Sequence, residues 1–91
     1  MFDNIKYYEI EFDTEPRNSE NWDGDCVGQY SICILGIRKP TFAEAAQFCK
    51  SDMEKWGSKY VVNVKRISQL EARTYFDMDR EKDFPVFGKT A

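Results

Sequence analysis

The residue types that usually carry catalysis are scarce in this chain. Its 91 residues include no histidine, the most frequent general base and a common metal ligand. The sequence also has no glycine-rich phosphate loop, no serine or cysteine nucleophile motif and no cysteine cluster with zinc spacing. Catalysis by carboxylates alone needs a concave pocket, which a domain of this size rarely encloses. We therefore predict a protein that is not an enzyme and that holds no cofactor.

One run of acidic residues has the alternation of a calcium-binding loop: Asp77, Asp79, Glu81 and Asp83. In that loop the sharp turn requires glycine, but Lys82 stands there, and the closing bidentate position falls on Gly88. A solvated helix exit accounts for the run better. The sequence thus predicts no metal site.

Acidic side chains concentrate in the first quarter of the chain. The net charge is −3, but residues 1–25 carry eight acidic against two basic residues, a net −6, whereas residues 26–66 carry +4. The candidate protein-binding residues are Trp22 and the acids around it and on the preceding strand: Glu9, Glu11, Glu15, Glu20, Asp23 and Asp25. An aromatic residue among carboxylates is typical of a contact with a basic protein, and spaced carboxylates can imitate nucleic-acid phosphates. Alternatively, Trp22 covers the core and the acids only solvate the loop.

Three segments have the pattern of β-strands. Residues 6–13 alternate apolar and acidic side chains, which predicts one face in water, with Asp13 on that face. Residues 28–38 are apolar on both faces, as in a well-covered strand, and residues 59–67 are rich in β-branched side chains. Residues 14–27 between the first two strands are predicted to form a long acidic loop.

Two segments begin with the spacing of a capping box, Thr41 with Glu44 and Ser68 with Glu71, which predicts two helices. The first helix is expected to end at Gly57, with an apolar stripe of Phe42, Ala45, Cys49, Met53 and Trp56. The second is expected to reach about Asp77, with a buried side of Leu70, Ala72, Tyr75 and Phe76.

The order β-β-α-β-α predicts a single α+β domain over residues 1–91, a three-stranded sheet with both helices on one face. The helix between the second and third strands lets these run in the same direction, and the first strand is antiparallel to the second. Residues 84–87 (Phe-Pro-Val-Phe) are expected to lie on the core, with a short C-terminal edge strand as an option.

This topology gathers four basic residues at the carboxyl ends of two strands: Arg38, Lys39, Lys65 and Arg66. Both helices also begin at this edge, so their N-termini would favour anions there, including nucleic-acid phosphates. The simpler interpretation is that the four bases solvate the strand ends and balance the acidic quarter.

The three cysteines are odd in number and lack metal or redox spacing, which favours reduced thiols. No apolar run approaches the ~20 residues of a membrane span, and residues 1–13 do not have the pattern of a secretory signal. We therefore expect a cytoplasmic protein that does not enter a membrane.

Three segments, ICILGIRKPTFAEAAQFCKSDM, VVNVKRISQLEARTYFDM and FPVFG, together resemble small accessory domains of bacterial mobile genetic elements, of the kind found beside large polyvalent phage and plasmid proteins. The resemblance covers roughly residues 30–88 and assigns no role to any residue. In size and charge the chain is also similar to small acidic phage proteins that inhibit host defence, such as anti-CRISPR proteins.

These observations favour a non-enzymatic protein-binding module, acting through its acidic surface as a phage or mobile-element inhibitor of a basic, nucleic-acid-binding host protein. The alternative is a nucleic-acid- or anion-binding module that uses the basic edge. A third reading is a subunit that homodimerises through an open sheet edge, so that the chain is either a monomer or a homodimer.

Overall fold

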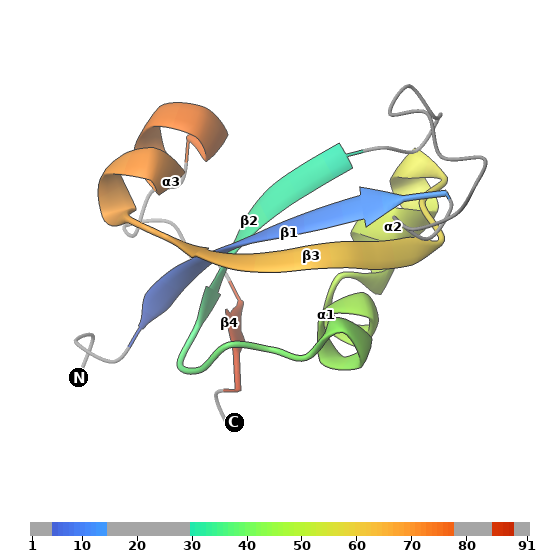
Figure 1. The fold of residues 1–91 in the computed structure, drawn as a ribbon, viewed down its shortest axis with the longest axis horizontal. Coiled ribbons are helices and arrows are strands. Elements are labelled where there is room, and N and C mark those ends of the chain that lie inside the picture. The colour runs from blue at the N-terminus through green and yellow to red at the C-terminus, as the bar shows by residue number, and fades with distance from the viewer. Residues whose placement is uncertain (1–4, 15–29, 78–84, 89–91) are drawn as a thin grey trace.

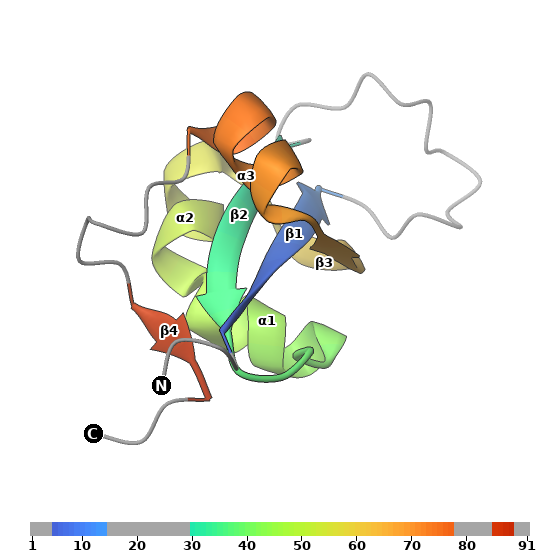
Figure 2. The same cartoon turned by 90° about the vertical axis from the view of Figure 1, so that its left-hand side faces the viewer.

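The sheet is built around its first strand. The computed structural model of the chain describes residues 5–14, 30–77 and 85–88. Within them, β1 (Lys6–Asp13) lies between two antiparallel neighbours, β2 (Tyr30–Gly36) and β3 (Tyr60–Ile67). A short β4 (Val86–Phe87) pairs in parallel with the end of β2, which gives the order β3-β1-β2-β4 (Figure 1; Figure 2).

The predicted strand directions are confirmed, because β2 and β3 are both antiparallel to β1 and so run the same way. The sheet has four strands and not three, and the added edge strand, β4, is the C-terminal strand that the sequence offered as an option. The described part of β2 begins at Tyr30. The strand ends at Gly36, two residues before the predicted end.

Three helices are present among the described residues: α1 (Phe42–Phe48), α2 (Lys50–Trp56) and α3 (Gln69–Phe76). The predicted single first helix is divided at Cys49, whose backbone (φ −102°, ψ 19°) leaves the helical region. The Cys49 N–H still donates to the Ala45 carbonyl at 2.9 Å, and the Cys49 carbonyl accepts from the Met53 N–H at 3.0 Å, so helical hydrogen bonds continue on both sides of the junction. Gly57, at φ 73°, ends α2 in the left-handed conformation that glycine adopts without strain.

Both predicted capping boxes are confirmed. The Thr41 hydroxyl accepts from the Glu44 N–H at 3.1 Å, and the Glu44 carboxylate accepts from the Thr41 N–H at 3.0 Å. Ser68 and Glu71 form the same pair of bonds at 3.1 and 3.3 Å. Each helix start is therefore fixed by contacts within four residues, which explains why sequence reasoning could locate it.

The helices do not share one face of the sheet, contrary to the prediction. On one face, α1 and α2 cover a core that includes Tyr8, Ile10, Phe12, Ile34, Val64, Ala45, Cys49 and Met53. On the other, α3 covers a smaller cluster of Tyr7, Leu35, Ile67 and Ala72 (Figure 1). The reason is the register at the end of β3: Ile67 pairs with Tyr7 and is buried on that second face, so the chain leaves the sheet there.

Several side chains differ from their predicted exposure. Leu70 and Tyr75 are each 75% exposed, because α3 packs on the sheet through Ala72 and Phe76 instead. Phe42 is 51% exposed at the first turn of α1, and Trp56 stacks on Tyr30 at the sheet rim with 4.6 Å between ring centroids.

Asp13 is fully buried, although its place in the alternation of β1 predicts contact with water. It is the last residue of the strand, and its carboxylate accepts from the Thr14 N–H at 2.7 Å. Its carbonyl accepts from the Lys59 N–H at 2.9 Å, which ties the end of β1 to the segment before β3.

A pair of truncations tests this division between buried and exposed side chains. Ile10→Ala removes a fully buried side chain from the central strand and should lower the free energy of unfolding by about 2–5 kcal/mol. Leu70→Ala should change it by no more than about 0.5 kcal/mol, because Leu70 lies in solvent. Urea denaturation followed by circular dichroism measures both. A large loss for Leu70→Ala would mean that α3 packs through the face predicted from the sequence.

Candidate protein-binding surface

The second face of the sheet carries the described acidic candidates. Glu9 and Glu11 are two residues apart on β1, so both project toward the side that holds α3. Glu9 lies opposite Cys33 and Lys65 in the register of the neighbouring strands. Both glutamates are half-buried, because they stand on the central strand while α3 covers only the end of this face.

A groove of about 390 Å³ separates α3 from the sheet. Its lining consists of Glu9, Ser31, Ile67, Glu71, Tyr75 and Phe76. Two carboxylates thus face a space bounded by a tyrosine, a phenylalanine and an isoleucine. Carboxylates with aromatic walls are suited to a basic side chain, whose aliphatic stem packs on the rings while its charge meets the acids.

Glu11 extends the acidic row along β1, away from α3. The side-chain amide of Asn63 on β3 donates to the Glu11 carboxylate at 3.3 Å. Beyond this pair the register shifts by one residue, so that Phe12 lies opposite Val61 and Val62 is the extra residue of a β-bulge. The row of Glu9 and Glu11 therefore ends where the strand twist increases.

The other predicted protein-binding residues lie outside the described residues: Glu15, Glu20, Trp22, Asp23 and Asp25. The prediction that the acidic loop takes part in the surface stays a prediction. The sequence analysis did not identify four residues of the groove wall. It placed Ser31 in a strand, Tyr75 and Phe76 on the buried side of a helix, and Glu71 in a capping box. The signal that could have found the groove was the two-sided apolar pattern of β2, which requires cover on both faces.

The predicted basic edge is divided by the structure. Arg38 donates to the Glu44 carboxylate with both terminal nitrogens, at 2.9 and 2.6 Å, and its guanidinium lies 4.8 Å from the centre of the Phe87 ring. Lys65 and Arg66 are neighbours on β3, so they point to opposite faces: Lys65 stands across from Glu9, and Arg66 across from Tyr8. Lys39 is exposed.

β1 lies between β2 and β3, so Arg38 and Lys39 follow one strand and Lys65 and Arg66 belong to a strand that is not its neighbour. An anion at this edge would compete with Glu44 for Arg38.

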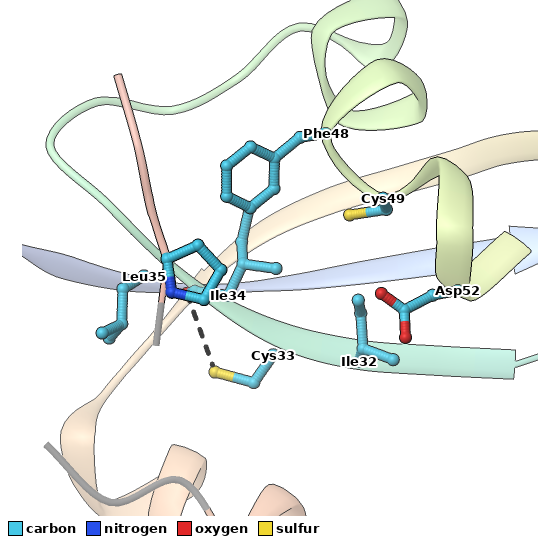
Figure 3. Close-up of a pocket in the computed structure, with 8 residues that line it drawn as sticks. Ile32, Cys33, Ile34, Leu35, Phe48, Cys49 and Asp52 are labelled. Atoms are coloured by element: carbon cyan, nitrogen blue, oxygen red, sulfur yellow. Dashed lines mark hydrogen bonds between the residues drawn. The ribbon is translucent and has the colours of Figure 1, made fainter. Parts of the chain in front are cut away.

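A second groove, of about 250 Å³, follows the outer side of β2 (Figure 3). Apolar side chains from the strand and from α1 line it, together with Cys49, Pro85 and the carboxylate of Asp52. Burial, with Asp52 nearby, raises the pKa of the Cys49 thiol to about 12, and burial raises that of Cys33 to about 11. Both thiols are free and stay protonated near neutral pH, so neither is an activated nucleophile.

Within the described part of the chain, no three His, Cys, Asp or Glu side chains group closely enough to hold a metal ion. None of the helices described is long and apolar enough to cross a membrane. Comparison with protein families, with curated proteins and with solved structures found no match for this chain.

The Arg38–Glu44 pair makes a measurable prediction about pH. The hydrogen bonds from Arg38 lower the pKa of Glu44 from its ordinary 4.5 to about 2. The pair therefore stabilises the folded state fully above pH 4.5, and this contribution disappears as the pH falls from 4.5 through about 2. Carboxyl carbon chemical shifts, followed by NMR, should titrate near 2 in the wild type and return toward 4.5 in Arg38→Ala. Equal midpoints in the two proteins would show that the pair does not form in solution.

Proposed function

We propose that this chain is a non-enzymatic protein-binding module that uses its acidic sheet face to hold a basic segment of another protein. The observation that carries the proposal is the groove beside α3, whose lining combines the carboxylates of Glu9 and Glu71 with Tyr75 and Phe76. The surface combines negative charge with aromatic contact area, the two properties that most often anchor a basic partner.

The electrostatic balance of this face supports the choice. Among the described residues of this face, Glu9, Glu11 and Glu71 are acidic, and Lys65 lies opposite Glu9. Among the described residues, Arg38 and Glu44 form an ion pair, but Glu9 and Lys65 do not. Glu9 therefore keeps its charge available to a partner without first breaking a contact with an arginine or lysine.

The partner class follows from the charge pattern. Carboxylates two residues apart on a strand are about 7 Å apart, and such a row can stand in for part of a nucleic-acid backbone. A basic, nucleic-acid-binding protein is therefore the partner that this surface fits, and occupation of its basic site would inhibit it. The resemblance to accessory domains of mobile genetic elements suggests the biological role: the chain would be a phage or plasmid product that inhibits a host protein.

The proposal predicts a charge-specific loss of binding. Glu9→Gln keeps the size and shape of the side chain but removes one charged hydrogen-bond acceptor, which should weaken partner binding about tenfold. Glu54→Gln is the matched control, because Glu54 is an exposed residue of α2 on the other side of the sheet. Affinity capture from a bacterial lysate with the three proteins as bait, quantified by mass spectrometry, gives the comparison.

Proteins that bind through this face should be retained by the wild type and by Glu54→Gln, and be reduced with Glu9→Gln. Their capture should also decline between 0.1 and 0.5 M salt, since a contact between exposed charges is screened. If Glu9→Gln retains the same proteins in the same amounts as the wild type, the acidic groove is not the binding surface.

A further inference from the structure

The outer edge of β2 is only partly covered. β4 pairs with β2 at two positions, where Leu35 lies opposite Val86 and Gly36 opposite Phe87, and the Ile37 N–H continues the contact by donating to the Phe87 carbonyl at 3.1 Å. In residues 5–14, 30–77 and 85–88, no strand pairs with this edge over positions 30–34. Five residues of β2, about 16 Å of strand, therefore have an open hydrogen-bonding edge.

The open edge forms one side of the groove drawn in Figure 3. Ile32 and Ile34 project from β2 to the side where Phe48 and Cys49 descend from the helices, and Cys33 projects to the opposite side of the strand. The carboxylate of Asp52, on α2, is turned toward Ile32. Asp52 is the charged residue in the lining of this groove. The rest of the lining consists of apolar side chains and the two cysteines, Cys33 and Cys49.

The two edges of the sheet differ in their protection. β3, the opposite edge, carries a bulge at Val62 and the exposed charges of Lys65 and Arg66, all features that prevent one strand from pairing with another. Positions 31–34 of β2 read Ser-Ile-Cys-Ile and have neither a charge nor a bulge. In the part of the chain that the structure describes, strand addition is thus blocked at the β3 edge, and positions 30–34 of the β2 edge have no paired strand.

We propose that this open edge binds an extended segment of a partner protein, which adds a strand beside β2 in line with β4. The backbone of the segment would pair with residues 30–34, as β4 already pairs with Leu35 and Gly36. Because side chains alternate along a strand, every second one would enter the groove between Ile32, Ile34 and Phe48. A lysine or arginine among them would meet Asp52, so the segment combines apolar residues with one base. The proposal concerns the face of α1 and α2 and does not rest on the acidic groove beside α3.

The experiment uses the full chain and a displayed library of random ten-residue peptides as the probe. Peptides selected by the wild type should alternate β-branched or aromatic residues with others and carry a lysine or arginine. A selected peptide, measured by isothermal titration calorimetry, should bind Asp52→Asn and Asp52→Lys at least tenfold more weakly than the wild type. Glu54→Lys, the same change of charge two residues along α2 and outside the groove, should keep the affinity within about twofold.

Amide hydrogen exchange measured by NMR locates the binding. In the free protein the outward-facing amides of residues 31–34 should exchange rapidly, and they should become protected when the peptide is bound. Glu9→Gln should leave peptide affinity unchanged, which separates this proposal from that of the acidic face. The proposal is overturned if the library yields no such peptides, if Glu54→Lys weakens binding as much as Asp52→Lys, or if these amides are already protected in the free chain. A dimer mass by light scattering, with protection of the same amides, would identify a second copy as the occupant and would also overturn it.

Discussion

The central position of β1, paired along both edges and in contact with helices on both faces, is the constraint on which the rest of the structure depends. Tyr8, Ile10 and Phe12 face α1 and α2, while Tyr7 faces α3. A strand that is paired along both edges is central, and its two antiparallel neighbours must then run in the same direction. The connection between β2 and β3 has to cross over β1, and α1 with α2 forms that crossover on the larger core.

The two layers of helix cover the sheet unequally, and this inequality creates the acidic surface. α1 and α2 together pack along the face of Ile10 and Phe12, whereas the eight residues of α3 reach only the end near Tyr7 and Ile67. A charged side chain on a central strand costs free energy unless it reaches water or, like Asp13, is hydrogen-bonded where it is buried. Glu9 and Glu11 occupy this uncovered stretch, and the groove lies where it meets α3.

The glutamates at the helix starts, Glu44 and Glu71, cap their helices, and Glu44 also holds a nearby base. Glu44 caps α1 and also binds Arg38, so one carboxylate satisfies a helix terminus and neutralises a base that the sequence analysis assigned to an anion-binding edge. The remaining bases on β3 project to both faces of an edge strand, where they solvate it and discourage pairing. Charged side chains are therefore distributed unevenly: the β3 edge carries bases that residues 31–34 of the β2 edge lack, and the α3 face carries Glu9 and Glu11.

The amino-acid sequence by itself determined the features that depend on residues close together in the chain. The capping boxes at Thr41 and Ser68, the stop at Gly57 and the extent of β1 follow from hydrogen bonds and periodicities within a few residues. The common direction of β2 and β3 followed from the order of the elements.

Only the tertiary structure decided which face α3 covers. That choice turns on the side of the sheet to which Ile67 points, which is set by its register with Tyr7, 60 residues earlier in the chain. It exposes Leu70 and Tyr75, which the sequence predicted to be buried, and it brings Glu71 and Glu9 into the lining of one groove. The open edge of β2 depends on where a two-residue β4 pairs, which no local pattern specifies.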